Sequence, residues 1–396
     1  MKIRFLLLNA YAVGGTVRTV VNQANALAEA GHDVEIVSVH RHRAEPRFAL
    51  HPKVRLRALV DDTRPPSRWT SPLTYQRQHR PSRLVPETEV RFDRFSRLTD
   101  RRVVRYLRSL HDGVLITTRP ALNLLSARFT PTSVVRVGQE HLHYSHHKPE
   151  LAREIGRWYR RLDAVTVLTA ADEDAYLRRL GDSGVRVECV PNPLSEDTPE
   201  RAGLDRPLVV SAGRLVKGKG FATLIKAFEP IARTHPEWQL RIYGAGPERD
   251  RLRALIHDRH LYNHVYLMGA TQEFDRELAK ASVFALASRR EGFGMVLAEA
   301  MSHGIPPVSF DCPHGPREII TDGEDGVLVP LGDTRGLTAA LTRLVEDDAL
   351  RKKLGGHAVE SARRYTPARV RARWEALLTV LLEQKAQETQ KVRREA

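Results

Sequence analysis

Short apolar runs alternate along this chain with polar or glycine-containing turns and with longer segments of helical spacing. Residues 3–8 and 34–39 are mainly apolar, and residues 16–30 between them carry apolar side chains three and four positions apart. Apolar strands that alternate with helices are typical of parallel sheets, whose two faces are both covered. The pattern therefore predicts an α/β fold.

The same alternation continues to the end of the chain, interrupted by a proline-rich, acidic segment at 191–207 that resembles a linker. Before this segment it predicts further strands at 114–117, 133–138, 164–168 and 185–190, and helices at 98–110, 149–161 and 170–180. After it, strands are expected at 208–212, 239–243, 265–268, 283–286, 307–310 and 327–329. The accompanying helices are expected at 221–234, 247–259, 295–303, 334–345 and 370–382, with a frayed tail after Gln384.

Length and composition add limits to this picture. A chain of 396 residues exceeds what one hydrophobic core usually holds, so two doubly wound domains are expected. No apolar run approaches the roughly 20 residues of a membrane span, and residues 3–8 are too short for a signal-peptide core. Cys189 and Cys312 lie far apart, which argues against a disulfide framework. We therefore expect a cytoplasmic protein.

The net charge of +15 indicates attraction to anions such as nucleic acid, anionic lipid or nucleotide sugars. Arginine outnumbers lysine along the whole chain, as biased codon usage also produces, so the charge alone does not identify a partner. Aromatic residues are not interleaved with the basic ones, and no nucleic-acid-binding module is recognisable. Nucleic-acid binding is therefore the distant alternative.

Gly14 and Gly15 directly follow the first strand and begin the first helix. Glycine at this place lets backbone N–H groups approach an anion, and the helix dipole favours negative charge there. The spacing is not the G-x-G-x-x-G of dinucleotide-binding proteins. Two glycines between a strand and a helix also suit an ordinary turn.

Residues 213–220, with the sequence Gly-Arg-Leu-Val-Lys-Gly-Lys-Gly, again lie between a strand and a helix. Arg214 and Lys219 would stand at the carboxyl edge of a sheet, where open α/β folds bind ligands. Arginine binds phosphate in bidentate fashion and lysine acts as a point charge. The order of residues is not that of a Walker loop, and a solvated basic loop is the alternative.

The segment 288–301 carries the most specific pattern. Its glycines precede a helix whose first amides, around Gly294, Met295 and Val296, would be free to bind a diphosphate. Glu299 lies about one turn into this helix, and Glu291 stands before the glycines. Two such carboxylates can flank a polyhydroxyl ligand, although a carboxylate near a helix start is also commonly a cap.

The core Glu-Gly-Phe-Gly-Met-Val-Leu-Ala-Glu-Ala-Met at 291–301 resembles the E-x7-E signature of the family-4 retaining glycosyltransferases. The likeness extends to Gly-Arg-Leu at 213–215, Val-Pro-Asn-Pro at 190–193, Tyr-Gly-Ala-Gly-Pro at 243–247 and the Gly14–Gly15 loop. It implies the GT-B fold, in which two Rossmann-like domains face each other across a cleft and a C-terminal helix crosses back to the first domain. Residues 1–195 would form the acceptor-side domain, 207–368 the nucleotide-sugar domain, and 369–396 the crossover helix and tail.

The resemblance also implies roles for individual residues. Arg214 and Lys219 would bind the donor diphosphate and stabilise the leaving group, and the amides of Gly294, Met295 and Val296 would hold phosphate together with Gly14 and Gly15. Glu299 would hold the ribose and Glu291 the donor sugar, with Gly244 near the base. These assignments make His141, Glu291, Arg214 and Lys219 the catalytic candidates.

The family places a histidine after a strand of the first domain, and His141 is the best match. Leu142 follows it where relatives often have an aspartate, and His143, His146 and His147 crowd the same loop. No cysteine or carboxylate stands at ligand spacing, which argues against zinc. Asp172-Glu173-Asp174 begins a helix and suits capping charge better than a D-x-D metal motif. We expect no metal and no cofactor.

Together these residues predict a retaining hexosyltransferase that takes a hexose or N-acetylhexosamine from a nucleotide diphosphate sugar. UDP is the expected nucleotide on family frequency, and the acceptor would be a glycan, a cell-wall or lipid-linked saccharide, or a natural product. A nucleotide-sugar epimerase on the same fold is the nearest alternative. An epimerase would turn over the donor with no acceptor added.

A stripe of arginines recurs at helical spacing in the segment 92–110, formed by Arg94, Arg97, Arg101, Arg105 and Arg108. Apolar residues, among them Phe95, Val103 and Leu107, form the opposite face. Such a helix would lie on the inner face of an anionic membrane or steer an anionic acceptor. It also suits a helix that packs its apolar face on the core and leaves the arginines in water, and we favour that for the apolar face.

Overall fold

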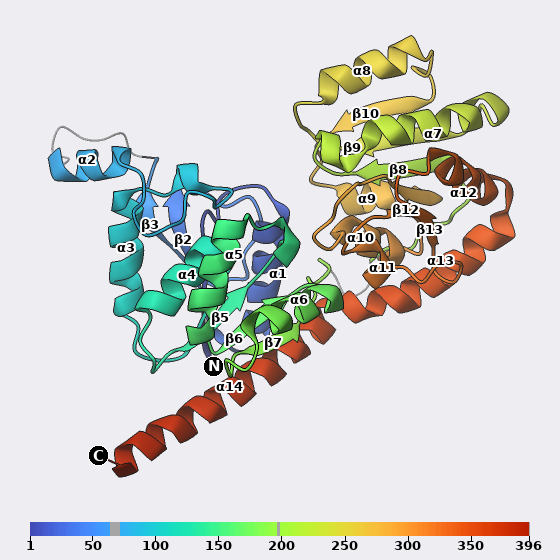
Figure 1. The fold of residues 1–396 in the computed structure, drawn as a ribbon. Coiled ribbons are helices and arrows are strands. Elements are labelled where there is room, and N and C mark those ends of the chain that lie inside the picture. Colours follow the sequence, from blue (N-terminus) through green and yellow to red (C-terminus); the bar gives the residue numbers. More distant parts are fainter. Residues whose placement is uncertain (64–71, 196–198, 396) are drawn as a thin grey trace. The chain divides into compact units, whose positions relative to one another are not determined.

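The computed structural model describes residues 1–63, 72–195 and 199–395. The chain divides into two compact units, which we call unit 1 (Met1–Pro193 with Pro367–Ala396) and unit 2 (Leu194–Thr366). Each unit contains one parallel sheet with helices on both faces (Figure 1). This confirms the fold class expected from the sequence, two Rossmann-like α/β units.

Unit 1 holds a seven-stranded sheet in the order β3-β2-β1-β4-β5-β6-β7. Its strands are β1 (Lys2–Leu7), β2 (Asp33–Arg41), β3 (Arg55–Asp61), β4 (Val114–Thr117), β5 (Val135–Gln139), β6 (Ala164–Val167) and β7 (Arg186–Cys189). The order reverses between β1 and β4, so the chain has wound outward from the centre in both directions. Loops that follow these two strands diverge, which is where doubly wound sheets bind ligands.

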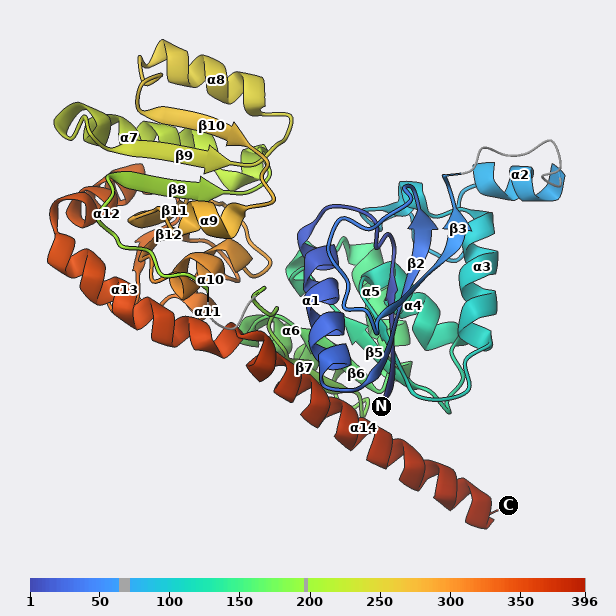
Figure 2. The ribbon, with the colours of Figure 1, turned by 180° about the vertical axis from the view of Figure 1, so that it is seen from behind.

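The helices of unit 1 are α1 (Gly15–Glu29), α2 (Pro72–His79), α3 (Arg97–Arg108), α4 (Pro120–Phe129), α5 (Pro149–Trp158), α6 (Ala170–Leu180) and α14 (Pro367–Glu395). Successive strand residues point to opposite faces. Phe5 packs in the cluster that contains α1 and α14, whereas the next residue, Leu6, packs with α3 and α4. Figure 2 shows α1 beside α14 on the first of these faces.

Unit 2 holds a six-stranded sheet in the order β10-β9-β8-β11-β12-β13. Its strands are β8 (Leu208–Ala212), β9 (Gln239–Tyr243), β10 (Val265–Gly269), β11 (Val283–Leu286), β12 (Pro307–Asp311) and β13 (Val327–Pro330). Its helices are α7 (Phe221–Thr234), α8 (Arg249–Asp258), α9 (Phe274–Leu278), α10 (Met295–Ser302), α11 (Pro316–Ile319), α12 (Thr334–Glu346) and α13 (Asp348–Ala362). The largest core cluster joins this sheet to α7, α8 and α12.

Part of the expected linker belongs to unit 2. Residues 196–198 lie outside the described residues, but the backbone that follows them bonds to the body of the unit. The amide of Ala202 donates to the carbonyl of His303 at 2.9 Å, and Arg351 donates to the carbonyl of Leu204. The segment is therefore packed after residue 199, because its backbone groups find partners there.

The last helix corrects the prediction of a frayed tail. Helix α14 continues to Glu395, well beyond the expected end at residue 382. Residues 384–395 contain no glycine or proline and are rich in strong helix formers. Within this extension, Lys385 donates to the carboxylate of Asp163 at 2.5 Å, which ties it to unit 1.

Helix α3 agrees with the helix expected at 98–110, but the arginine-rich segment 92–110 is not one continuous helix. Residues Phe92–Arg94 form a separate 3₁₀ turn, and α3 starts after Ser96, whose hydroxyl accepts from the Thr99 amide while Thr99 accepts from the Ser96 amide. This capping box fixes the helix start. The apolar face of α3 is buried on the core, as favoured from the sequence. Strand β3 and helix α4 were missed, because alternating arginines and a short apolar run gave no clear period.

Among the described residues, no helix has the length and apolarity that crossing a membrane requires. The large apolar side chains exposed at the surface are scattered: Val13, Val90, Leu142, Leu177, Tyr262, Met268 and Leu331. None of them lies on α3. The arginine helix therefore presents no apolar residue of this size to solvent.

Candidate active site

The sheet of unit 2 reverses its strand order between β8 and β11. All strands are parallel, so the loops that follow them meet at one edge. The basic loop 213–220 follows β8, and the loop 287–294 follows β11. Two motifs that are far apart in the sequence thus lie at the same switch point, the usual ligand position of an open α/β sheet.

Glycine backbone holds these loops against each other. A Cβ atom on Gly220 would lie 1.9 Å from the carbonyl oxygen of Ala287, and one on Gly244 would lie 1.9 Å from that of Gly213. The amide of Arg289 also donates to the carbonyl of Gly218 at 2.9 Å. No larger residue fits at Gly220 or Gly244, so the loops after β8, β9 and β11 form one packed group.

A charged pair joins the two motifs. The Nζ atom of Lys219 donates to the Oε1 atom of Glu291 at 2.6 Å, with 23% of the lysine side chain and 8% of the glutamate side chain exposed. An ammonium group has three donors, so Lys219 keeps two N–H groups for an anion. The contact also orients the Glu291 carboxylate toward the basic loop.

The turn after β12 packs beneath this pair. A Cβ atom on Gly315 would lie 2.5 Å from the carbonyl oxygen of Phe293, so the turn needs glycine there. Cys312 is buried in the same turn. Burial, and then the charge of Glu291, raise the pKa of the Cys312 thiol to about 12. The thiol therefore remains protonated at neutral pH and is not a nucleophile.

Helix α10 begins at this edge with its amides uncapped by any side chain. Gly294 is the N-cap residue, in the left-handed conformation with φ of 98°, which favours glycine. Met295 and Val296 are half-buried in the first turn, and Glu299 is buried one turn further along. An uncapped helix start presents N–H groups and a partial positive charge to an anion.

Arg214 follows β8 and Tyr243 ends β9, at the same edge of the sheet as the Lys219–Glu291 pair. Arg214 is exposed, and its guanidinium makes no hydrogen bond or ion pair with any described residue. The hydroxyl of Tyr243 donates to the Oε2 atom of Glu277 at 2.5 Å, and its ring packs edge-on against Phe274. Burial and then this bond raise the pKa of Tyr243, so it forms a neutral wall beside Gly244.

In unit 1, Gly14 and Gly15 follow β1 beside the reversal point of the sheet. Gly14 is the N-cap of α1, no side chain caps this helix, and both glycines are exposed. A Cβ atom at either glycine would meet nothing within 4 Å. Packing inside unit 1 therefore does not require glycine at these two positions, which leaves an approaching ligand as a physical reason for it.

His141 lies in the loop that follows β5, on the other side of the same reversal point. Its Nε2 atom is buried and has no hydrogen-bond partner among the described residues. Burial, with a smaller contribution from Arg119, lowers the pKa of His141 to about 4. The imidazole is therefore neutral at pH 7 and offers a ring nitrogen to a ligand.

The neighbouring histidines are held by the protein. His143 caps the 3₁₀ turn Tyr144–His146 and lies 3.5 Å from the carboxylate of Asp172. The Nε2 atom of His147 is 3.2 Å from the hydroxyl of Tyr176. Among the residues that the structure describes, no three His, Cys, Asp or Glu side chains converge in a way that would hold a metal ion.

A buried polar network that was not predicted from the sequence lies beneath this loop. The Oε1 atom of Glu140 accepts hydrogen bonds from the hydroxyl of Tyr159 and, at 2.8 Å, from Asn123. Its Oε2 atom has no hydrogen-bond partner among the described residues. Burial raises the pKa of Glu140 to about 8. Burial favours the protonated carboxyl, because taking an ionised carboxylate out of water costs more free energy than taking a neutral one.

Asp172 and Glu173 lie in the first turn of helix α6, as expected from the sequence. Thr169 is the N-cap residue, and its side chain accepts from the Asp172 amide. The Asp172 carboxylate is buried and accepts from the amide of Tyr144 at 2.8 Å, so it supports the histidine loop. Burial raises the pKa of Asp172 to about 7.

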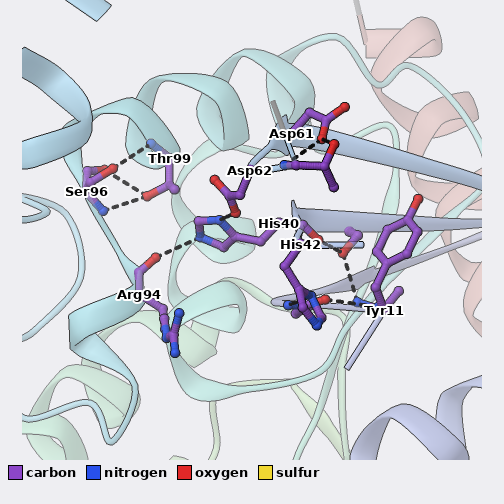
Figure 3. Close-up of polar contacts among 12 residues, drawn as sticks. Tyr11, His40, His42, Asp61, Asp62, Arg94, Ser96 and Thr99 are labelled. Atoms are coloured by element: carbon purple, nitrogen blue, oxygen red, sulfur yellow. Dashed lines mark hydrogen bonds and ion pairs between the residues drawn. The ribbon is translucent and has the colours of Figure 1, made fainter. Parts of the chain in front are cut away.

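A second polar group lies at the carboxyl ends of β2 and β3 (Figure 3). The ring of His40 bridges the carboxylate of Asp62 at 2.7 Å and the backbone carbonyl of Arg94 at 2.9 Å. Nearby, Asn9 bonds to His42, and the Arg41 guanidinium lies over the ring of Tyr11. His40 thereby anchors the start of the arginine-rich segment to the sheet edge.

Two protein-family models match the chain and together span most of it. Residues 13–198 match glycosyltransferase family 4, and residues 195–360 match glycosyl transferases group 1. The chain belongs to the family-4 glycosyltransferases, which have the GT-B fold. The predicted family is therefore confirmed.

Two glycosyltransferases and a phosphotransferase are among the proteins that resemble this family-4 glycosyltransferase. An exopolysaccharide phosphotransferase of Streptomyces coelicolor is 37% identical over 394 residues, which cover 96% of this chain and 41% of that protein. An uncharacterized glycosyltransferase of Haemophilus influenzae is 24% identical, covering 95% of this chain and 99% of that one. The poly(glycerol-phosphate) alpha-glucosyltransferase of Bacillus subtilis is 28% identical, covering 71% and 43%. The chain thus spans less than half of the first and third proteins.

Solved structures of low identity share the GT-B fold. A mutant of S. aureus TarM in complex with Fondaparinux, alpha-GlcNAc-glycerol and UDP matches with a TM-score of 0.76 at 16% identity, over 96% of this chain and 100% of that one. The pneumococcal O-GlcNAc transferase GtfA in complex with UDP and GlcNAc matches with a TM-score of 0.73 at 14% identity, over 96% and 99%. These likenesses concern the fold.

The structure groups the predicted site residues of this glycosyltransferase by unit. In unit 2 the loops after β8, β9 and β11 bring together the positions expected to bind the donor: Arg214, Lys219, Gly244, Glu291, Gly294, Met295, Val296 and Glu299. In unit 1, Gly14, Gly15 and His141 lie at the carboxyl edge of the other sheet. Sequence reasoning missed Glu140 and His40, because their surroundings come from strands and helices distant along the chain.

Proposed function

We propose that this glycosyltransferase moves a hexosyl or N-acetylhexosaminyl group from a UDP-sugar to a cell-envelope glycan, with retention of configuration and without a metal ion. The observation that carries the proposal is the meeting of Lys219, Glu291 and the uncapped start of α10 at the switch point of unit 2. Several structural relatives were solved in complex with UDP, which supports it as the nucleotide.

The diphosphate is the group that this site suits best. Arg214 and Lys219 provide two positive charges, and the amides at Gly294, Met295 and Val296 provide oriented donors. As the bond between the anomeric carbon and the phosphate oxygen breaks, negative charge grows on the diphosphate. Preorganised donors stabilise that charge more than they stabilise the bound donor, and this lowers the barrier.

The carboxylates and glycines would hold the rest of the donor. Glu299 would accept hydrogen bonds from the ribose hydroxyls, and Glu291, oriented by Lys219, would accept from the transferred sugar. Gly244 would lie near the base, beside the neutral ring of Tyr243. His141, neutral because of its low pKa, would offer Nε2 to a sugar hydroxyl, and Gly14 and Gly15 would contact the donor phosphates.

Retention follows if the acceptor attacks the face from which the diphosphate leaves. The acceptor oxygen forms its bond to the anomeric carbon, and its proton passes to the departing phosphate oxygen. The products are the glycoside and the nucleoside diphosphate. This route needs no protein base.

The names of relatives point to the acceptor class. They include an exopolysaccharide protein, a poly(glycerol-phosphate) glucosyltransferase and lipopolysaccharide core glycosyltransferases. These are all molecules of the cell envelope. We therefore place the acceptor of this chain among envelope glycans and polyol phosphates.

A thermal-shift screen of UDP, GDP and ADP and their common sugar derivatives tests the donor. We expect UDP compounds to raise the melting temperature most, since a ligand present at a hundredfold excess over Kd stabilises by about 2.7 kcal/mol. The anomeric configuration of the product, read by NMR, then tests retention. No response to any nucleotide would refute the donor site, and donor turnover to an epimer without acceptor would favour an epimerase.

A further inference from the structure

Six arginines form a continuous basic surface over α3, α4 and α5 of unit 1. They are Arg101, Arg105 and Arg108 of α3, Arg128 of α4, Arg157 of α5, and Arg161 of the 3₁₀ turn that follows α5, and we call them the arginine face. Helices α3 and α5 each contact α4, so the three lie side by side in the same unit (Figure 1). A shallow hollow of about 460 Å³ is lined by the first three arginines with Val104 and Ser109.

Aromatic rings space these side chains and hold them at the surface. Arg108 and Arg128 lie over the ring of Phe129, at 5.4 and 5.0 Å from its centroid. Arg128 and Arg161 lie over the ring of Trp158, at 5.2 and 4.7 Å. Stacking immobilises a guanidinium while its edge can still bind an anion, although Arg128 also donates to the carbonyl of Leu84 at 3.0 Å. The face is therefore ordered before any ligand arrives.

The charge of the face is not neutralised within the protein. None of the six arginines forms an ion pair with a described carboxylate, whereas Arg233 and Arg251 of unit 2 each pair with a glutamate. Glu154 accepts from the indole of Trp158. Burial lowers the pKa of Arg128; the charge of Glu154 opposes this shift, and the charge of Arg157 adds to it. Bringing like charges together in this way costs free energy, which a bound anion would recover.

The face is connected to the carboxyl edge of the sheet of unit 1. Helix α3 begins beside Arg94, whose carbonyl is held by His40 at the end of β2 (Figure 3). From this point, α3 extends over about 17 Å, and its arginines lie about 6 Å apart along the helix axis. An extended chain with its end at the carboxyl edge would lie along it.

We propose that the arginine face binds a flexible polyanionic chain with repeating phosphate groups, and that this chain is the body of the acceptor whose end is glycosylated. The assignment of the chain as acceptor rests on the proposed function. Planar guanidinium groups in a row match successive phosphates, because each forms a bidentate contact. This inference adds the chemical class of the acceptor, a chain with repeating phosphate groups, to the proposed function.

A phosphate-bearing chain suits the face better than a membrane does. Peripheral membrane helices combine basic residues with large apolar side chains that enter the lipid, and no residue of that kind is exposed on α3. Single-stranded nucleic acid would stack its bases on aromatic rings. Here the faces of Phe129 and Trp158 are covered by arginines.

Fluorescence anisotropy with labelled poly(glycerol phosphate) tests the face in the full chain. The variant Arg101→Gln with Arg105→Gln removes two exposed charges that make no described contact. We expect its Kd to rise about tenfold and the slope of log Kd against log salt to fall by about 2, as expected for two lost phosphate contacts. Neutral dextran of similar length should not bind either protein.

The matched control removes the same charge elsewhere. Arg253→Gln with Arg343→Gln changes two exposed arginines of α8 and α12 in unit 2, and its Kd should change less than twofold. An equal loss in both variants would overturn the proposal, because net charge alone would then explain binding. Tighter binding to phosphatidylglycerol vesicles or to duplex DNA, lost in the first variant, would also overturn it.

UDP affinity separates this proposal from the proposed function. Calorimetry should give the same UDP affinity for the wild type and both variants, since none of the four arginines is in the donor site. If the wild type binds no nucleotide, the donor site fails whatever the polyanion does. If UDP binds and poly(glycerol phosphate) does not, the arginine face alone is refuted.

Discussion

Lys219 and Glu291 come from different loops of unit 2, yet their side chains meet at 2.6 Å. The contact is charge-assisted and only partly open to water, so it is stronger than an ordinary surface pair. It places a cation and a carboxylate together where the loops after β8 and β11 converge. In the proposed reaction, Lys219 would bind the diphosphate while it orients Glu291, the group that would contact the sugar.

Replacing Lys219 by alanine should lower kcat for transfer by about 100-fold to 1,000-fold, as the loss of one preorganised donor typically does. Steady-state kinetics with the identified UDP-sugar measures this. Lys217→Ala, which removes an exposed charge two residues earlier, should keep near-normal turnover. A Lys219→Ala protein that is folded by circular dichroism and fully active would exclude Lys219 from the site.

Glu140 makes a pH-dependent contribution to stability. Its pKa is about 8 in the folded protein, against an ordinary value of 4.5. The folded state therefore binds the proton more tightly than the unfolded state, and the free energy of unfolding falls as pH rises from about 4.5 to about 8. Asp172 acts in the same direction between 3.8 and about 7.

Glu140→Gln should remove the Glu140 contribution to this pH dependence, because glutamine imitates the protonated carboxyl. We expect the variant to match the wild type near pH 5 and to melt at a higher temperature than the wild type at pH 8.5. Thermal denaturation across this range measures the difference. Parallel curves for the two proteins would show that Glu140 does not titrate in the window.

Helix α14 brings together two parts of the chain that are far apart in the sequence. It follows unit 2 in sequence but contributes Trp374, Leu377 and Leu378 to the core cluster of unit 1, beside α1. Its amphipathic face was visible in the sequence, whereas its partner was implied only by the family resemblance. Burial of these side chains is what makes the last helix part of the first unit.

Trp374→Ala should destabilise unit 1 by about 3–5 kcal/mol, since it empties the space of the largest fully buried side chain. Urea denaturation followed by circular dichroism measures the loss. Arg373→Ala, at the exposed neighbouring position, should change stability by less than about 0.5 kcal/mol. Equal effects of the two substitutions would mean that α14 is not docked on α1.

The whole molecule carries an excess of 15 positive charges, and the basic residues lie in several parts of the structure. Some lie in the basic loop of unit 2, and others form the arginine face of unit 1. A site that already holds arginine, lysine and helix amides has little need of a divalent ion to neutralise a diphosphate. This charge distribution supports a reaction without metal.

Turnover should be unchanged after dialysis against EDTA and should not rise when Mg²⁺ or Mn²⁺ is added back. Initial rates with the donor and acceptor at fixed ionic strength measure this, because added salt would weaken polyanion binding by itself. A rate that falls with EDTA and recovers with Mg²⁺ would contradict metal independence. Melting curves with and without EDTA serve as the control for folding.

The sequence by itself determined most of the strands and the motifs of this protein. Helix α7 and strands β8, β9 and β11 were predicted to the residue, because their apolar patterns are regular. Motif spacing placed Lys219 and Glu291 after strands of the same domain. Local rules suffice for such features, since period, turn chemistry and helix starts depend on neighbours in the chain.

The tertiary structure decided which groups meet and in what state. It paired Lys219 with Glu291, buried Glu140 and Asp172 beneath the histidine loop, and turned a stripe on α3 into a face shared with α4 and α5. The capping box at Ser96 also set where that helix begins. Protonation and charge pairing depend on burial and on residues far away in sequence, and only the folded chain defines both.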